Sequence, residues 1–461
     1  MIPIAPRALP LLVVSLALAA CDPPASPVST AGPSAAPAPP PPVTSASTAS
    51  TTSTAPAPPP PVAAAAPAPL AKPAATDELA RLARSNNAFA LDFYGKVRAQ
   101  KGNLAISPFS ISTALDLTWA GAKAETASQM AKVLHLDGPP DRTLDVAGSL
   151  VASYGAPDQK VTVRIANRLF GEQTFAFEQP YLTRVKSAFG APLEPLDFKN
   201  AAEDGRKHIN GWVAGQTQDR IKDLIPPLGV DKTTALVLVN AIYLLGEWAT
   251  PFKKESTTPA PFFTGKSDKK DVLTMHQDDH LRFAATDGVK LLELPYQNGA
   301  LGMDFVLPDA VDGLDALEAR LTPAALDRWL GAASAAHVDV SLPRIEIAPA
   351  TSLSVGDTLS SLGMPLAFDS GKADFTGIGK PPNPAERLYI SRVFHKAFVK
   401  IDEKGTEAAA ATAVVMAVGG AAPLPEARRE FKADHPFLFF LRDLRSGLVL
   451  FMGRVADPAS K

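Results

Sequence analysis

The sequence predicts an α+β domain over residues 76–461, and three patterns within that region predict this class. Apolar residues recur at helical spacing over residues 79–93, which indicates an amphipathic helix. Residues 161–170 alternate between apolar and polar, as a half-buried strand does, and residues 235–245 form a near-continuous apolar run that suits a strand buried on both faces. No low-complexity break divides the region, so we expect one large domain.

Later segments continue this mixture of helices and strands. Ser107 followed by Pro108 indicates a helix start, because serine caps the first turn and proline fits the first helical position. Strand patterns follow at residues 291–295 and 301–309, which predict a hairpin, and at residues 338–347 and 389–401.

The N-terminus has the pattern of an export signal. Arg7 precedes the apolar run of residues 11–20, which is too short to span a bilayer comfortably and is typical of a signal peptide. The last four residues of segment 1–21 resemble a bacterial lipobox, in which the cysteine thiol is acylated and cleavage leaves Cys21 as the new N-terminus. We therefore expect a lipoprotein-type signal peptide over residues 1–21. An ordinary secretory signal with an incidental cysteine is the alternative.

Residues 22–75 consist almost wholly of Pro, Ala, Ser, Thr and Val. Such a segment has little apolar surface to bury and many prolines, so the sequence predicts an extended, disordered linker. A glycosylated stalk or a docking segment for partners would have the same composition. Together with Cys21, this linker predicts an exported protein, either anchored to a membrane as a lipoprotein or released as a periplasmic or extracellular protein.

Composition and motifs exclude several classes of function. A net charge of -2 implies no broad attraction to nucleic acid. The chain has no Gly-rich phosphate loop and no Gly-x-Ser-x-Gly motif, and its single cysteine lies in the signal segment. His276 and His280 lie four residues apart, but their neighbours predict a surface turn and strand rather than a metal-binding helix. We therefore expect no cofactor, no metal site and no enzyme activity.

The segment from Asp402 to Pro436 is the most informative part of the chain. Its alanine-rich part invites a helix, yet it has no apolar face at helical spacing, and its β-branched residues favour an extended chain. Alternate positions give one face with Thr406, Ala408, Ala410, Thr412, Val414, Met416 and Val418, and another that begins with Glu407, Ala409, Ala411 and Ala413. This pattern predicts a strand with a small, increasingly apolar inner face. An exposed alanine-rich linker between two strands is the alternative.

This segment resembles the hinge and reactive loop of an inhibitory serpin. The matching hinge residues are Glu403, Gly405, Thr406, Glu407, Ala408, Ala409, Ala410 and Ala411. Residues 431–439 resemble the strand that follows the family's reactive loop, and the resemblance spans residues 77–461. It implies a serpin fold over residues 76–461, with a large central, mostly antiparallel sheet A, two smaller sheets, about nine helices and an exposed reactive-centre loop at about residues 403–430.

The resemblance also implies a mechanism, in which a protease cleaves the loop and the hinge side then inserts into sheet A, so that the acyl-protease is trapped. Counting from the hinge places the cleaved bond at Gly419–Gly420, with Met416 and Val418 as neighbouring candidates and Leu424 and Arg428 less favoured. From Gly405 to that bond is about 14 residues, or roughly 45 Å of strand. The interval from Gly405 to Pro436 is 31 residues, which is longer than is common in the family. Small and apolar residues around the bond indicate an elastase-like or subtilisin-like serine protease as the partner, and a cysteine protease is a further candidate.

Five more residues match positions around sheet A. Ser107, Ser110, Asn240 and His395 match the family's shutter beneath the sheet, and Trp248 matches the breach, where the loop enters. The resemblance implies a bond between Asn240 and His395. Local roles remain open alternatives: a helix cap for Ser107, a helix-surface serine for Ser110 and a hydrogen-bonded core amide for Asn240.

The expected function is that of a serine-type protease inhibitor that acts as a suicide pseudo-substrate, and we expect a monomer. The alternative is a non-inhibitory serpin that acts as a binding or carrier module. Against it, the hinge has Thr406 and four alanines, where a charged or bulky residue or a proline would block insertion. A secreted enzyme would need a group of nucleophile and base residues that the sequence does not reveal.

Overall fold

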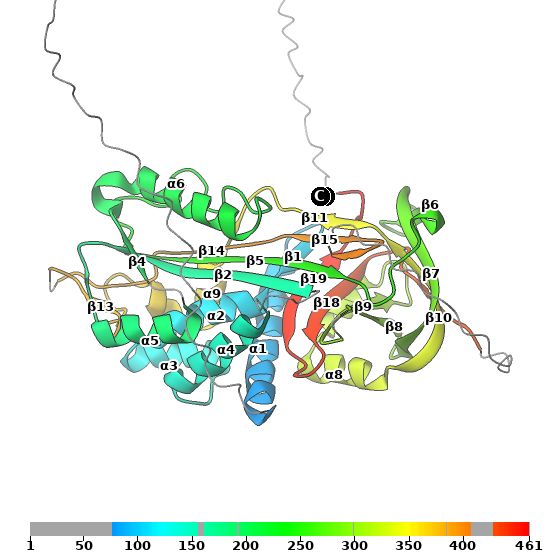
Figure 1. The fold of residues 1–461 in the computed structure, drawn as a ribbon, viewed down its shortest axis with the longest axis horizontal. Helices are drawn as coiled ribbons and strands as arrows, with labels where there is room; N and C mark the ends of the chain where they lie inside the picture. The colour runs from blue at the N-terminus through cyan, green and yellow to red at the C-terminus, as the bar shows by residue number, and fades with distance from the viewer. Residues whose placement is uncertain are drawn as a thin grey trace, which may run out of the picture. The chain divides into compact units, whose positions relative to one another are not determined.

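A computed structural model describes residues 76–154, 161–190, 193–297, 299–383, 385–406 and 427–460 of the chain (Figure 1). All of them lie in one unit that spans residues 65–461. Within these described ranges, no helix is long and apolar enough to cross a membrane. The expected signal peptide 1–21 with Cys21, and the linker 22–75, lie outside the described residues, so both stay predictions.

The described residues form nine α-helices and two short 3-10 helices. The helices are α1 (Thr76–Val97), α2 (Pro108–Trp119), α3 (Ala124–Val133), α4 (Pro140–Tyr154), α5 (Gln179–Phe189), α6 (Phe198–Gln216), α7 (Leu314–Ala319), α8 (Pro323–Ala332), α9 (Gly356–Leu362), η1 (Lys254–Ser256) and η2 (Pro365–Phe368). Ser107 is the N-cap of α2 as predicted, and its side chain accepts a hydrogen bond from the Ser110 backbone N–H.

The strands form three sheets. The nine-stranded sheet has the order β1 (Leu104–Ile106), β19 (Val449–Val455), β18 (Phe437–Asp443), β9 (Leu301–Pro308), β8 (Val289–Pro295), β7 (Lys269–Thr286), β10 (Ser334–Pro343) and β17 (Arg429–Lys432), and β6 (Thr258–Phe263) pairs with β7. The eight-stranded sheet has the order β11 (Ile345–Ile347), β15 (Val399–Asp402), β16 (Gly405–Thr406), β5 (Leu236–Glu247), β14 (Arg392–Ala397) and β12 (Leu353–Ser354), and β2 (Val161–Glu172) pairs with both β5 and β4 (Glu194–Leu196). The smallest sheet pairs β13 (Gly379–Lys380) with β3 (Ala176–Phe177).

Most neighbouring strands run antiparallel. Among the described strands, the parallel pairs are β14 with β5, β2 with β4 and β10 with β17. The predicted hairpin of residues 291–295 and 301–309 is present as β8 and β9. These elements confirm the α+β class, with large and mostly antiparallel sheets and nine helices among the described residues.

Helices cover both faces of the eight-stranded sheet. Figure 1 shows α6 on one face and α2, α4 and α5 on the other. The central strand β5 alternates between two cores accordingly. Its residues Val237, Val239, Ala241 and Tyr243 pack with α6, and Leu236, Leu238, Ile242 and Leu244 pack in the cores that contain α2. This double burial is the reason that residues 235–245 read as a continuous apolar run.

Two local predictions were wrong in detail. The strand expected over residues 389–401 is divided at Phe398 into β14 and β15, because its neighbour changes there from β5 to β16. No turn occurs at His276, because residues 269–286 form the single long strand β7. In both cases the deciding influence is a neighbouring strand that local sequence does not identify.

Candidate functional site: the hinge and the strand seam

The hinge begins as a strand that already lies inside the eight-stranded sheet. Strand β16 is two residues long, and it lies between β5 and β15. Thr406 pairs with Gly246 of β5 and with Ile401 of β15, in both cases antiparallel. The first residues of the loop thus occupy the position of a central strand at one end of the sheet.

Gly405 is required by its surroundings. Its φ angle is +148°, and a Cβ atom built there would lie 2.0 Å from the carbonyl oxygen of Gly246. Only glycine combines this backbone conformation with such a close approach of two strands. Gly405 therefore allows the chain to turn from β15 into β16.

Beneath β16 the two strands of the sheet separate. Strand β14 runs parallel to β5, and their last registered pair is Ala397 with Ile242. The first pair that β5 makes with the hinge is Gly246 with Thr406. We call the boundary between β5 and β14, from Val237 to Ile242, the seam. Strand β16 lies directly above the end of this seam.

Glu403 ties the hinge to two residues that border the nine-stranded sheet, Arg344 after β10 and Thr257 before β6. Its carboxylate oxygen Oε1 accepts hydrogen bonds from Arg344 Nε at 2.9 Å and from the Thr257 hydroxyl at 2.5 Å. Burial would raise the pKa of this carboxyl, but the hydrogen bonds from Arg344 and Thr257 outweigh burial and leave the pKa of Glu403 lowered. Glu403 is therefore held as a buried, ionised anchor at the start of the hinge.

An aromatic pair supports the other side of the hinge. Trp248 donates its backbone N–H to the Lys404 carbonyl at 2.8 Å and its indole N–H to the Asp402 carbonyl at 3.0 Å. Its ring stacks on Tyr296 with a centroid distance of 4.6 Å. The Tyr296 hydroxyl lies 2.6 Å from the hydroxyl of Thr406, and both residues are buried. These contacts close the entry end of the sheet around the first hinge residues.

A chain of buried polar groups crosses the seam. The Ser107 backbone N–H donates to His395 Nε2 at 3.1 Å, so the ring proton lies on Nδ1 and is donated to Asn240 Oδ1 at 2.6 Å. The Asn240 amide then donates to Asn167 Oδ1 at 2.9 Å, and that oxygen also accepts the Ser110 hydroxyl at 3.2 Å. Burial lowers the pKa of His395 to about 3, which keeps the ring neutral.

The structure thus brings together four of the five residues expected around the sheet, Ser107, Ser110, Asn240 and His395, and places the fifth apart from them. The implied bond between Asn240 and His395 is present, and Trp248 lies against the hinge. Sequence reasoning missed Asn167, Tyr296 and Arg344. The available signals were a polar residue in the middle of the predicted strand 161–170, an aromatic residue directly after the strand 291–295, and an arginine within 338–347.

Part of the predicted loop cannot be placed. Glu407, Ala408, Ala409, Ala410, Ala411, Met416, Val418, Gly419, Gly420 and Leu424 lie outside the described residues. Arg428 is described; its guanidinium lies 3.2 Å from the Asp278 carboxylate and is largely exposed. The chain then enters β17, whose Phe431 is fully buried beside β10. The two ends of the loop therefore belong to different sheets.

The described residues hold no cluster of three His, Cys, Asp or Glu side chains that could bind a metal ion. His280 stacks on His337 across β7 and β10 with a centroid distance of 4.8 Å, and His337 contacts Asp278. His276 faces Ser341 instead, at 3.0 Å.

A central sheet that holds the first residues of a long loop between two separating strands defines a class of protein that accepts an additional strand. The family model "Serpin (serine protease inhibitor)" matches residues 84–458, and the chain belongs to the serpin family. It is thus a serine protease inhibitor by family and not an enzyme.

Individual relatives agree with this assignment. The chain is 40% identical over 390 residues to leukocyte elastase inhibitor A of Rattus norvegicus, an alignment that covers 82% of this chain and all (100%) of the rat protein. Its fold is similar to that of uncleaved ovalbumin, with a TM-score of 0.73, 29% identity and coverage of 82% of this chain and 100% of ovalbumin. It is also similar to human thyroxine-binding globulin in complex with thyroxine, with a TM-score of 0.74, 26% identity and coverage of 83% of this chain and 100% of the globulin. These matches confirm the serpin fold that the hinge motif predicted.

Proposed function

We propose that the protein inhibits its target protease as a suicide pseudo-substrate, with residues 403–430 as the bait. The protease cleaves the loop at Gly419–Gly420, and the hinge side inserts into the seam while the protease is still joined to it as an acyl-enzyme. The observation that carries this proposal is the position of β16, between β5 and β15 and directly above the seam.

The register of β16 predicts where each inserted residue would lie. Because Thr406 pairs antiparallel with Gly246, each further loop residue would meet the preceding residue of β5. Ala410 would meet Ile242, Thr412 would meet Asn240, and Met416 would meet Leu236 at the far end of β5. An insertion that uses all of β5 therefore ends three residues before Gly419, which agrees with the predicted bond.

The side chains of the loop suit the two faces that they would join. Directly paired residues point to the same face of a sheet, so the even-numbered loop residues would enter the core of Ile242 and Leu244. Alanines and threonine on this face bring little volume and little side-chain entropy to lose, while the new strand pairs its backbone groups on both sides. Burial of the larger Val414 and Met416 at the far end adds apolar stabilisation.

Insertion must pass the polar chain that crosses the seam. His395 is now the direct partner of Asn240, and an inserted strand would separate β14 from β5 at that pair. Thr412 would arrive between them, and its hydroxyl can replace the lost hydrogen bond to either side chain. The Asn240 amide would therefore keep a hydrogen-bond partner in the inserted state, which lowers the energetic cost of insertion.

We propose that the target is a serine protease with a preference for small or apolar residues. The rat relative is named as an inhibitor of leukocyte elastase, and Met416, Val418 and Gly419 offer only small or apolar side chains near the bond. Subtilisin-like and cysteine proteases are further candidate targets, and the experiment below includes both. The loop before Gly419 has no basic residue after Lys404, which disfavours trypsin-like enzymes.

We also propose that the protein is exported and held at a membrane by a lipid on Cys21, with residues 22–75 as a spacer and the inhibitor domain as a monomer. The lipobox-like end of segment 1–21 and the single cysteine of the chain support this. Cells that express the wild type should incorporate a labelled fatty acid into the protein, and cells that express Cys21→Ser should not. Equal labelling of both proteins would refute the anchor without affecting the inhibitor proposal.

The inhibitor proposal is tested by mixing the full chain with elastase-, subtilisin-, trypsin- and papain-like proteases and separating boiled samples on a denaturing gel. A band at the summed mass of protease and inhibitor would establish a covalent complex, and the mass of the released C-terminal peptide would identify the cleaved bond. Clean cleavage with no such band, and with no gain in thermal stability, would contradict inhibition. That outcome would favour the alternative function of a carrier module, which the likeness to thyroxine-binding globulin supports.

A further inference from the structure

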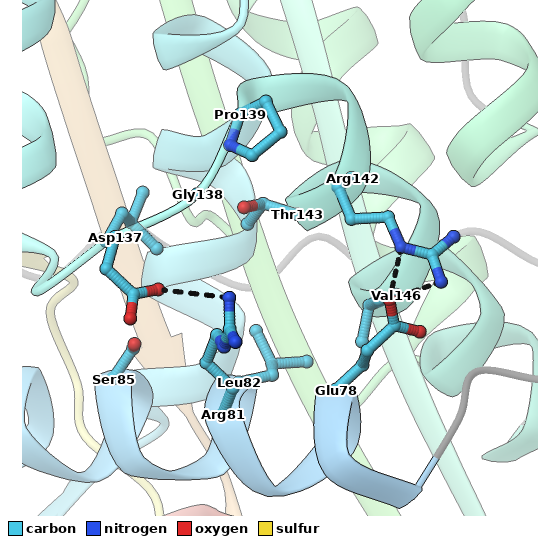
Figure 2. A pocket seen from close by; sticks show the side chains of 11 residues that line it. Glu78, Arg81, Leu82, Ser85, Asp137, Gly138, Pro139, Arg142, Thr143 and Val146 are labelled. Atoms are coloured by element: carbon cyan, nitrogen blue, oxygen red, sulfur yellow. Dashed lines mark hydrogen bonds and ion pairs between the residues drawn. The ribbon is translucent and has the colours of Figure 1, made fainter.

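A small cavity lies between the first turns of α1 and the start of α4. Figure 2 shows α1 below it, α4 to one side and the connection of residues 136–139 above it. The cavity has a volume of about 70 Å³. It lies on the helical side of the domain, and its lining includes no residue of the hinge or the seam.

The cavity has an apolar floor and a rim of paired charges. Leu82 and Val146 form the floor, and both are more than nine-tenths buried. At the rim, Arg142 pairs with Glu78, and Arg81 lies 4.0 Å from Asp137 (Figure 2). Each cation at the rim faces an acidic group, so the cavity suits an uncharged aliphatic side chain better than an anion.

The chain itself supplies such a side chain close by. Helix α1 begins at Thr76, only two residues before Glu78 of the rim. In residues 22–75, Leu70 is the single leucine, and Asp22 and Lys72 are the two charged residues. The uniform composition of the tail is therefore interrupted at Leu70 and Lys72, immediately before the domain.

The tail is long enough to reach the cavity. Six residues separate Leu70 from Thr76, and an extended Pro-rich chain advances about 3.1 Å per residue, so Leu70 can lie up to roughly 19 Å from the helix start. Leu82 lies six residues along α1, or roughly 9 Å at about 1.5 Å per residue, on a helix about 10 Å wide. The reach exceeds the distance when the chain reverses its direction directly before Thr76, so that the extended residues run back along α1.

The tail is also prepared for binding by its prolines. Pro67, Pro69 and Pro73 restrict the chain before it binds, so less conformational entropy is lost on docking. An extended Pro-rich segment leaves its carbonyl oxygens without internal hydrogen bonds. At the rim, the guanidinium groups of Arg81 and Arg142 and the hydroxyls of Ser85 and Thr143 are the donors that could bind such carbonyls.

We propose that residues 65–75 fold back along α1 and insert the Leu70 side chain into this cavity, with Lys72 beside the acidic groups Glu78 and Asp137. The docked tail would end the free spacer at about residue 65 and fix the direction in which it leaves the inhibitor domain. The proposal requires neither protease trapping nor a lipid on Cys21, so it can fail or succeed independently of both.

Cysteine cross-linking tests the proposal in the full chain with Cys21→Ser as background. Ala71→Cys with Thr143→Cys, which keeps Leu70, should form a disulfide under mild oxidation at least about tenfold faster than the control pair Ala66→Cys with Thr143→Cys. In a freely moving tail the two pairs would react at nearly the same rate, because effective concentration changes slowly with tether length. Equal rates for the two pairs would overturn the proposal.

Hydrogen exchange gives a second measurement without any new thiol. In Leu70→Asp, the amides of the first turns of α1 and of residues 137–143 should exchange several-fold faster than in the wild type. The matched control Ala66→Asp adds the same charge four residues away and should leave this exchange unchanged. Identical exchange in the wild type and both variants would mean that the tail does not dock here.

Discussion

Replacing Thr406 by arginine should convert the inhibitor into a substrate. Thr406 is 1% exposed, it is paired on both sides by Gly246 and Ile401, and its hydroxyl lies 2.6 Å from that of Tyr296. An arginine at this position would have to bury a guanidinium group with no acidic partner facing it from Gly246, Ile401 or Tyr296. We therefore expect β16 to leave the sheet and the hinge to remain outside it.

The energetic cost of Thr406→Arg follows from the burial of Thr406. Loss of the hydroxyl contact costs about 1 kcal/mol, and burial of an unpaired cation costs several kcal/mol more. Even about 3 kcal/mol in the barrier to insertion slows that step more than a hundredfold. Hydrolysis of the acyl-enzyme would then be complete before the protease is trapped.

The assay is the number of inhibitor molecules consumed per protease molecule inactivated, together with the covalent band on a denaturing gel. Thr406→Arg should be cleaved at the same bond as the wild type, at a similar rate, with no covalent band. Thr406→Ser keeps the hydroxyl and should behave as the wild type does. A covalent band from Thr406→Arg in wild-type yield would refute the insertion mechanism.

Three further substitutions test the surroundings of the hinge and the core. Arg344→Ala leaves the buried Glu403 carboxylate without its cationic partner and should lower the free energy of unfolding by about 1–3 kcal/mol in urea titrations; an unchanged midpoint would contradict the anchor role. Burial lowers the pKa of His395 from 6.5 to about 3, so between these values the unfolded chain binds one more proton than the folded chain. Stability should therefore fall by up to about 1.4 kcal/mol per pH unit below pH 6.5, and His395→Gln should remove this part of the slope; the same slope in both proteins would exclude His395 as its source. Burial raises the pKa of Asp116 in α2 to about 8, and its Oδ1 has no hydrogen-bond partner among the described residues. Asp116→Leu should therefore raise the free energy of unfolding at pH 7 by about 1–4 kcal/mol. A lower melting temperature of the variant would show that the carboxyl has a partner.

Local sequence was sufficient wherever the deciding contacts were local. The cap at Ser107 and the hairpin of β8 and β9 depend on residues within a few positions of one another. The continuous apolar run of β5 was enough to predict that this strand is buried on both faces. The hinge was predicted from its resemblance to the serpin hinge, and the alternation of small residues predicted a strand. Of its residues the structure describes Glu403, Gly405 and Thr406, and Thr406 pairs with Gly246 of β5.

The missed residues depend on partners far away in the chain. Tyr296 meets Thr406 across 110 positions, and Arg344 meets Glu403 across 59. The division of the strand at Phe398 reflects the insertion of β16, which no pattern within residues 389–401 records. The bond at Gly419–Gly420 lies outside the described residues and stays a prediction.

The attachment of the loop to two different sheets bears on the lifetime of the uncleaved inhibitor. Thr406 lies in the eight-stranded sheet and Arg429 in the nine-stranded sheet, where Arg429 pairs with Val338 of β10. Full insertion would carry Gly419 roughly 45 Å along the seam, whereas the ten residues from Gly419 to Arg429 span at most about 36 Å. The uncleaved loop is therefore too short to insert fully into the seam unless β17 separates from the nine-stranded sheet. If insertion completes the sheet as proposed, the resting fold persists because of a kinetic barrier, its lifetime is set by a rate of opening, and each molecule can act only once.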